Sequence, residues 1–81
     1  MIYSAKITIH LKKGMLDPEA QAIRHALQNL GFATQNLSSA RLFEIGIEAK
    51  SADSAHKEAE KMCERLLANP VIHDYTIEVR E

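Results

Sequence analysis

Hydrophobic and polar residues alternate along three stretches of the chain, and each alternation predicts a β-strand with one buried face. Over residues 3–12 the odd positions are apolar and the even positions are polar. The same pattern runs through residues 43–50 and 75–80. A fourth, shorter strand is expected over residues 33–40, with a turn at residues 38–41 that leads into the next strand.

A helix is predicted from about Pro18 to Leu30, because apolar residues recur there three and four positions apart. Asp17 offers an N-cap carboxylate, and Pro18 suits the first helical turn. Gly31 can adopt the left-handed conformation that ends a helix. The stripe that should face the sheet consists of Leu16, Ala20, Ile23, Leu27 and Leu30.

A second helix is predicted after Ser51 or Asp53, either of which can cap it. It should end at Asn69-Pro70, because the residue before a proline avoids the helical conformation. Its apolar stripe follows the same spacing and consists of Ala52, Ala55, Ala59, Met62 and Leu66.

The predicted order of elements is strand, helix, strand, strand, helix, strand. Two β-α-β halves of this kind most often form an α+β, ferredoxin-like sandwich, in which a four-stranded antiparallel sheet carries both helices on one face. In this register Tyr3, Phe43 and Tyr75 face the helices. The open face therefore lacks the aromatic platform with which this fold binds RNA.

Composition limits what such a chain can do. Its 81 residues suffice for one domain, residues 1–81, and are few for an independent enzyme with a closed substrate pocket. A net charge of −1 argues against general binding to nucleic acid or to a membrane surface. A single cysteine, no signal-peptide pattern and no long apolar stretch indicate a soluble protein of the cytoplasm.

The residue types that could carry chemistry are present but are not grouped along the sequence. No histidine lies three to five residues from another, and Cys63 has no second thiol nearby, so no metal site is expected. Cys63 follows the stripe of the second helix and should be a buried, unreactive thiol. The histidines are His10, His25, His56 and His73.

Lys12, Lys13 and Gly14 form a small basic spot ahead of the first helix. An anion could bind at a helix N-terminus there, but Asp17 already occupies the capping position that a phosphate would need. We therefore interpret this segment as a solvated loop.

An apolar run, residues 66–72, crosses the end of the second helix and the loop that follows it. Loops are normally polar, so this run needs an explanation. Two are open: Val71 and Ile72 fill the end of the core, or they contact another subunit.

Two segments resemble one known family. The first is Leu11–Glu19, in which a lysine, a glycine and an apolar pair precede Asp-Pro, and the second is Met62–Tyr75, which contains the string Leu-Leu-Ala-Asn-Pro-Val-Ile. Both are similar to PurS, the small subunit of phosphoribosylformylglycinamidine synthase, and the resemblance spans nearly the whole chain. Residues 36–42 lack the family's usual valine-arginine and glycine-lysine residues.

The resemblance implies a non-catalytic subunit of purine biosynthesis. It should dimerise, with further pairing to a tetramer left open, and should bridge a large synthetase subunit and a glutaminase subunit so that ammonia passes between them. The complex uses ATP and Mg²⁺, and no cofactor is expected on this chain. The candidate positions are structural or interfacial: Lys12, Gly14, Asp17, Pro18, Asn69, Pro70, Val71, Ile72 and Tyr75.

Two alternatives come from other classes of protein. A ligand-binding regulatory domain of the ACT type has the same order of strands and helices and would bind a small metabolite between paired subunits. An independent small enzyme would need a convergent acid-base pair, and the nearest candidate, His10 with Glu44 or Glu48, is an ordinary cross-strand pairing.

Overall fold

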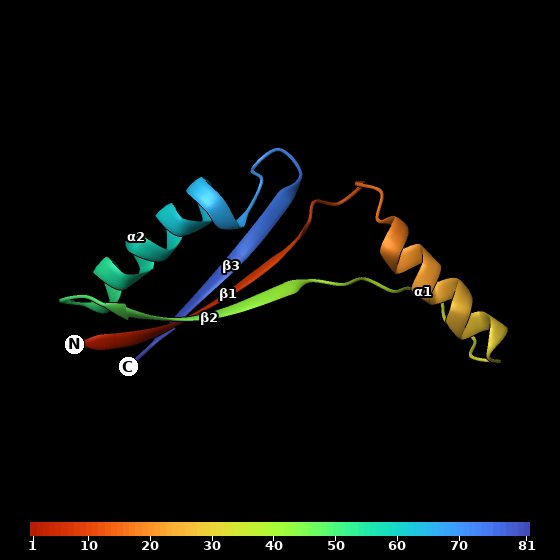
Figure 1. Cartoon of the computed structure of the whole chain (residues 1–81), viewed down its shortest axis with the longest axis horizontal. Helices are drawn as coiled ribbons and strands as arrows, with labels where there is room; N and C mark the ends of the chain where they lie inside the picture. The colour runs from red at the N-terminus through yellow and green to blue at the C-terminus, as the bar shows by residue number, and fades with distance from the viewer.

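The computed structural model describes residues 1–81 and contains three strands, not four. Strands β1 (Ile2–Leu11), β2 (Arg41–Glu48) and β3 (His73–Arg80) form an antiparallel sheet in the order β2-β1-β3 (Figure 1). The three predicted alternating strands are therefore confirmed. The sheet is the base of a compact part of the molecule, which we call the body.

Strand β1 lies in the centre of the sheet and supplies more of the buried core than any other element. Ile7 is paired with Phe43 on one side and with Ile77 on the other, so all three side chains point to the same face. The odd-numbered residues of β1 face inward, as their alternation predicts. Those that are buried are Tyr3, Ala5, Ile7 and Ile9.

Helix α2 (Ala52–Met62) and the π-helical turn η1 (Cys63–Leu67) cover this face of the sheet. Ser51 caps α2, because its hydroxyl accepts a hydrogen bond of 3.1 Å from the backbone N–H of Ser54. The residues that α2 and η1 bury most deeply are small, so the helix can approach the strands closely. They are Ala55, Ala59 and Cys63.

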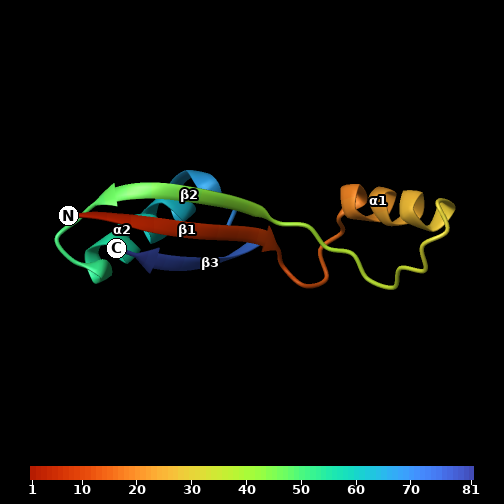
Figure 2. The same ribbon diagram turned by 90° about the horizontal axis from the view of Figure 1, so that it is seen from below.

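Helix α1 (Pro18–Asn29) stands away from the sheet at the far end of the molecule (Figures 1 and 2). The molecule is 51 Å long and its radius of gyration is 16.1 Å, whereas a compact chain of this length has one of about 12 Å. The prediction that both helices cover one face of the sheet is therefore wrong for this chain by itself. Leu16 and Leu30, predicted to be buried, are 72% and 73% exposed.

The strand predicted over residues 33–40 is also absent. This segment has no strand partner, and Figure 2 shows that it runs on from α1 into β2 without reversing. A tight hairpin turn needs glycine or asparagine at positions with positive φ, and residues 38–41 are Ser, Ser, Ala and Arg. With no turn here, the chain stays extended and holds α1 away from the sheet.

None of the helices in the structure is both long and apolar enough to cross a membrane.

The core makes a direct prediction about stability. Ile7 is fully buried between the sheet and α2, so Ile7→Ala should lower the free energy of unfolding by about 2–5 kcal/mol. Urea unfolding at a fixed protein concentration measures this. Ile2→Ala on the same strand, where the side chain is 70% exposed, should change it by less than about 0.5 kcal/mol. Similar losses in the two variants would contradict the assigned core.

Candidate interaction surface

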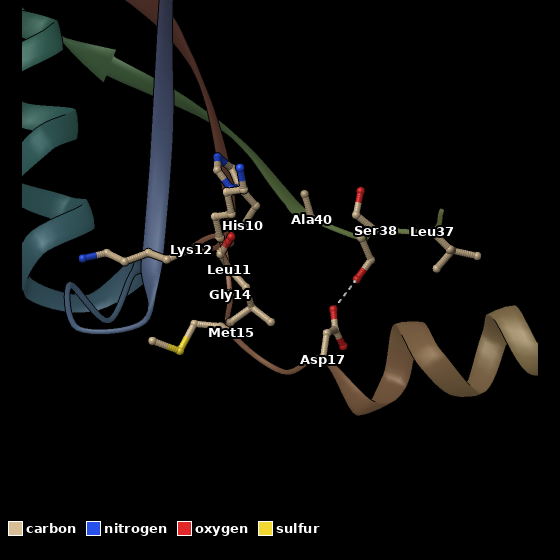
Figure 3. Close-up of a pocket in the computed structure, with 11 residues that line it drawn as sticks. His10, Leu11, Lys12, Gly14, Met15, Asp17, Leu37, Ser38 and Ala40 are labelled. Atoms are coloured by element: carbon tan, nitrogen blue, oxygen red, sulfur yellow. Dashed lines mark hydrogen bonds between the residues drawn. The ribbon is translucent and has the colours of Figure 1, made fainter. Parts of the chain in front are cut away.

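Two segments connect the body to the outlying helix: residues 12–17, which follow β1, and residues 38–40, which lead into β2. A hydrogen bond of Asp17 joins them. One carboxylate oxygen of Asp17 accepts the N–H of Ala20 at 3.1 Å and so caps α1 as predicted. The other accepts the hydroxyl of Ser39 at 3.4 Å (Figure 3). Pro18 occupies the first turn of the helix. Asp17 and Pro18 thus start the helix and fix where the two connecting segments meet.

Residues 16–37, which we call the arm, are folded although they lie away from the sheet. The guanidinium of Arg24 donates two hydrogen bonds, of 3.2 and 3.0 Å, to the carbonyl oxygen of Thr34. The side-chain amide of Gln28 donates a third to the same oxygen at 3.5 Å. Gly31, with φ of 99°, ends the helix and lets the chain turn back along it. The sequence alone gave no sign of this clamp.

The arm exposes much of its apolar surface. Ile23 is 43% exposed and Phe32 is 59% exposed, in addition to the two leucines at the ends of the helical stripe. A monomeric protein rarely leaves a contiguous apolar stripe in water, and such stripes mark sites of association. The arm therefore carries an unpartnered apolar face.

The body has an apolar groove of about 430 Å³ beside α2. It lies between α2 and β2, on the part of the sheet where α2 gives least cover. Charged side chains of α2 and η1 form its rim. The groove is lined by Ile45, Glu58, Lys61, Met62, Arg65, Leu66 and Leu67.

The apolar run at residues 66–72 divides between core and surface. Ala68 is buried and Ile72 is partly buried, whereas Leu66 is 84% exposed and Val71 is 72% exposed. Val71 thus does not fill the end of the core, which removes one of the two explanations for this residue.

Asn69 organises the turn that presents Val71. Its side-chain oxygen accepts the N–H of Val71 at 3.0 Å. Its carbonyl oxygen accepts the N–H groups of Ile72 and His73 at 3.0 and 2.8 Å. Its own N–H donates to Nδ1 of His73 at 2.9 Å. We call residues 69–72 the Asn69 turn.

The Asn69 turn lies beside the segment that leads to the arm. The N–H of Lys12 donates to the carbonyl oxygen of Ile72 at 2.8 Å, and Gly14, with φ of 88°, makes the bend that follows β1. The two groups of candidate residues, 60 positions apart in the sequence, thus meet at one end of the body. Sequence reasoning placed no contact between them.

A hollow of about 470 Å³ lies between the two connecting segments and includes the basic spot. Figure 3 shows the Lys12 side chain extending away from the Asp17 carboxylate. Lys12 therefore does not converge with the helix N-terminus on one point, where an anion would bind.

Tyr75 and Cys63 lie on the inner side of the body and remain neutral at neutral pH. Burial raises the pKa of the Cys63 thiol, and the carboxylates of Glu60 and Glu64 raise it further. Burial also raises the pKa of Tyr75, with Glu64 adding to the effect. A thiol in this state is a poor nucleophile. The structure also groups no three His, Cys, Asp or Glu side chains as a metal site would require.

These features define a small α+β protein whose most developed feature is apolar surface without a partner. Comparison with known proteins is consistent with this description: the family model PurS, described as phosphoribosylformylglycinamidine (FGAM) synthase, matches residues 4–81. The chain belongs to the PurS family.

Individual relatives agree with this assignment. The chain is 47% identical over 78 residues to the phosphoribosylformylglycinamidine synthase subunit PurS of Archaeoglobus fulgidus, covering 95% of this chain and 98% of the relative. It is 42% identical to the crystal structure of Methanocaldococcus jannaschii PurS, with a TM-score of 0.89 over 98% of this chain and 96% of that one.

A more distant neighbour, at 24% identity and a TM-score of 0.89, is a chain in the structure of PurLQS from Thermotoga maritima, each chain being covered to 98%. At this identity the likeness shows the fold. Because the matching relatives are PurS subunits, the ACT-type alternative is not favoured.

The Asn69 turn leads to a prediction. Asn69→Ala removes the side-chain oxygen that accepts the Val71 N–H, so it should lower the free energy of unfolding by about 0.5–1.5 kcal/mol. Thermal or urea unfolding measures the change. Asn29→Ala, at the end of α1, is the matched control, because Asn29 is exposed and its side chain makes no hydrogen bond in the structure. If the two variants are equally stable, the turn does not depend on Asn69.

Proposed function

We propose that this chain is the non-catalytic assembly subunit of phosphoribosylformylglycinamidine synthase. In this role it joins a large synthetase subunit and a glutaminase subunit, so that ammonia released at one active site reaches the other. The ATP- and Mg²⁺-dependent step, which converts formylglycinamide ribonucleotide into its amidine, belongs to the larger subunits. The observation that carries the proposal is the exposed apolar face of the arm in a chain that belongs to the PurS family.

The arm also supports self-association. In a closed ferredoxin-like fold, the first helix would cover the sheet next to the second, and residues 33–40 would pair with the free edge of β2. Here the extended residues 38–40 keep the arm from its own body, which leaves the groove beside α2 open. We infer that the arm of one copy occupies the groove of a second copy, and the reverse, in a homodimer with exchanged arms.

A charge on the apolar face of the arm should break this dimer. Ile23→Asp places a carboxylate in the exchanged interface, so the dissociation constant should rise at least about tenfold, the effect of 1.4 kcal/mol. Sedimentation velocity over a concentration series measures it. Gln21→Asp is the control, because Gln21 lies on the opposite side of α1 and the charge change is the same.

Cross-linking separates exchange of arms from closure within one chain. In a Cys63→Ser background, cysteines replacing Ile23 and Leu66 are joined with a short bismaleimide. Exchange predicts covalent dimers on a denaturing gel. Covalently closed monomers as the main product would overturn the exchanged arrangement.

The bridging role has its own test, with Val71 as the probed position. Val71→Ser should lower glutamine-dependent turnover of the reconstituted complex severalfold and should spare turnover with free ammonia, because the exposed Val71 side chain is available to contact a larger subunit. The double change of Val71 and Ile72 to Ser should act more strongly. Leu42→Ser, an exposed apolar residue on the open face of the sheet, is the control. Equal losses with both nitrogen sources would contradict bridging.

A further inference from the structure

The Asn69 turn is closed by a titratable side chain that acts as a hydrogen-bond acceptor. The N–H of Asn69 donates to Nδ1 of His73 at 2.9 Å, and a backbone N–H can only donate. Nδ1 must therefore be unprotonated, which requires the neutral imidazole with its proton on Nε2. The bond exists in this tautomer alone.

His73 connects the turn to the sheet. It is the first residue of β3 and is paired with Leu11 of β1, while its ring lies against the start of the turn. The same turn exposes Val71 and takes the N–H of Lys12 from the segment leading to the arm. A change at the His73 ring thus acts on the surface for which we propose a contact with another subunit.

We propose that His73 is a pH-sensitive latch on the Asn69 turn. Histidine is the side chain that ordinarily changes charge between about pH 5 and pH 8. When His73 gains its second proton, Nδ1 carries an N–H that points at the N–H of Asn69, and the hydrogen bond is replaced by a repulsion between two donors. The hydrogen bond is present with the neutral ring and lost with the protonated one, which removes one of the contacts that hold the turn and the exposed Val71 on it.

The charged groups around His73 set how readily the latch opens. Carboxylates favour the protonated ring, and cationic groups oppose it. The start of α1 contributes two carboxylates and β2 contributes one guanidinium to the hollow that His73 lines, while the neighbouring segments of β1, β3 and η1 add further charges. These groups are Asp17, Glu19 and Arg41 in the hollow, His10 on β1, Lys12 directly after β1, Asp74 on β3, and Glu64 beside Tyr75.

Two substitutions separate the effect of the hydrogen-bond acceptor at position 73 from the effect of protonating the His73 ring. His73→Asn keeps an acceptor oxygen near the position of Nδ1 but cannot take up a proton in this range. His73→Leu removes the acceptor at every pH. His56, which pairs with Glu60 on the exposed side of α2, gives ring signals in the same spectra and serves as an internal control.

The test follows the Asn69 amide proton and the ring nitrogens of His73 by ¹H–¹⁵N NMR on the full chain between pH 8 and pH 5. We expect Nδ1 to carry no proton at pH 8, and the Asn69 amide to lose its hydrogen-bonded shift as the ring titrates. In His73→Asn the Asn69 amide should stay unchanged over this range. At pH 7 it should exchange about tenfold faster in His73→Leu than in His73→Asn, as loss of one hydrogen bond implies.

Two results would overturn the latch. One is a proton on Nδ1 at pH 8. The other is an Asn69 amide that follows the same pH course in the wild type and in His73→Asn. If His73→Leu fails to fold, the comparison of the wild type with His73→Asn still decides the question, because both retain an acceptor at neutral pH.

Discussion

The separation of α1 from its own sheet is the constraint on which the rest of the structure depends. It arises from two connections, residues 12–17 and 38–40, that meet at Asp17 and Ser39 and do not lead the chain back over the sheet. Because these connections do not reverse, the apolar stripe of α1 and the groove beside α2 are both left without a partner in a single chain. Both apolar surfaces therefore lie in water, and the proposed exchange of arms covers the two together.

The body can tolerate this arrangement because its own core is narrow and well packed. The buried residues are all hydrophobic, and most are contributed by β1 and by the inner side of α2. Alanines on α2 bring the helix close to the strands, so a short chain can still form a dry interior. Such a core gives limited stability by itself, and a small protein of this kind gains from burying further apolar surface against a partner. The relatives of this chain are named as subunits of phosphoribosylformylglycinamidine synthase, which agrees with this need.

Sequence reasoning predicted what local physics decides. Three strands, two helices, the cap at Asp17 and a cap at Ser51 or Asp53 follow from the sequence, because alternation and capping depend on neighbouring residues; the structure selects Ser51. The position of α1 could not be predicted, because its apolar stripe has the same spacing whether the helix packs on the sheet of its own chain or on that of another chain. The prediction of a strand over residues 33–40 is wrong, and this is the segment in which the alternation of apolar and polar residues is weakest. At the candidate site, the resemblance pointed to Asn69 and Val71, but the contacts of Lys12 with Ile72 and of His73 with Asn69 join distant residues and required the structure.

The clamp of Arg24 on the carbonyl of Thr34 bears on how quickly subunits can assemble. An arm that was unfolded when free would have to order its backbone at the moment of contact, at a conformational cost of roughly 1–2 kcal/mol for each residue fixed. In an arm held by this clamp, the backbone is already ordered before two subunits meet. Encounter between two subunits then resembles the docking of preformed shapes, for which association rates are limited by diffusion and orientation instead of by coupled folding.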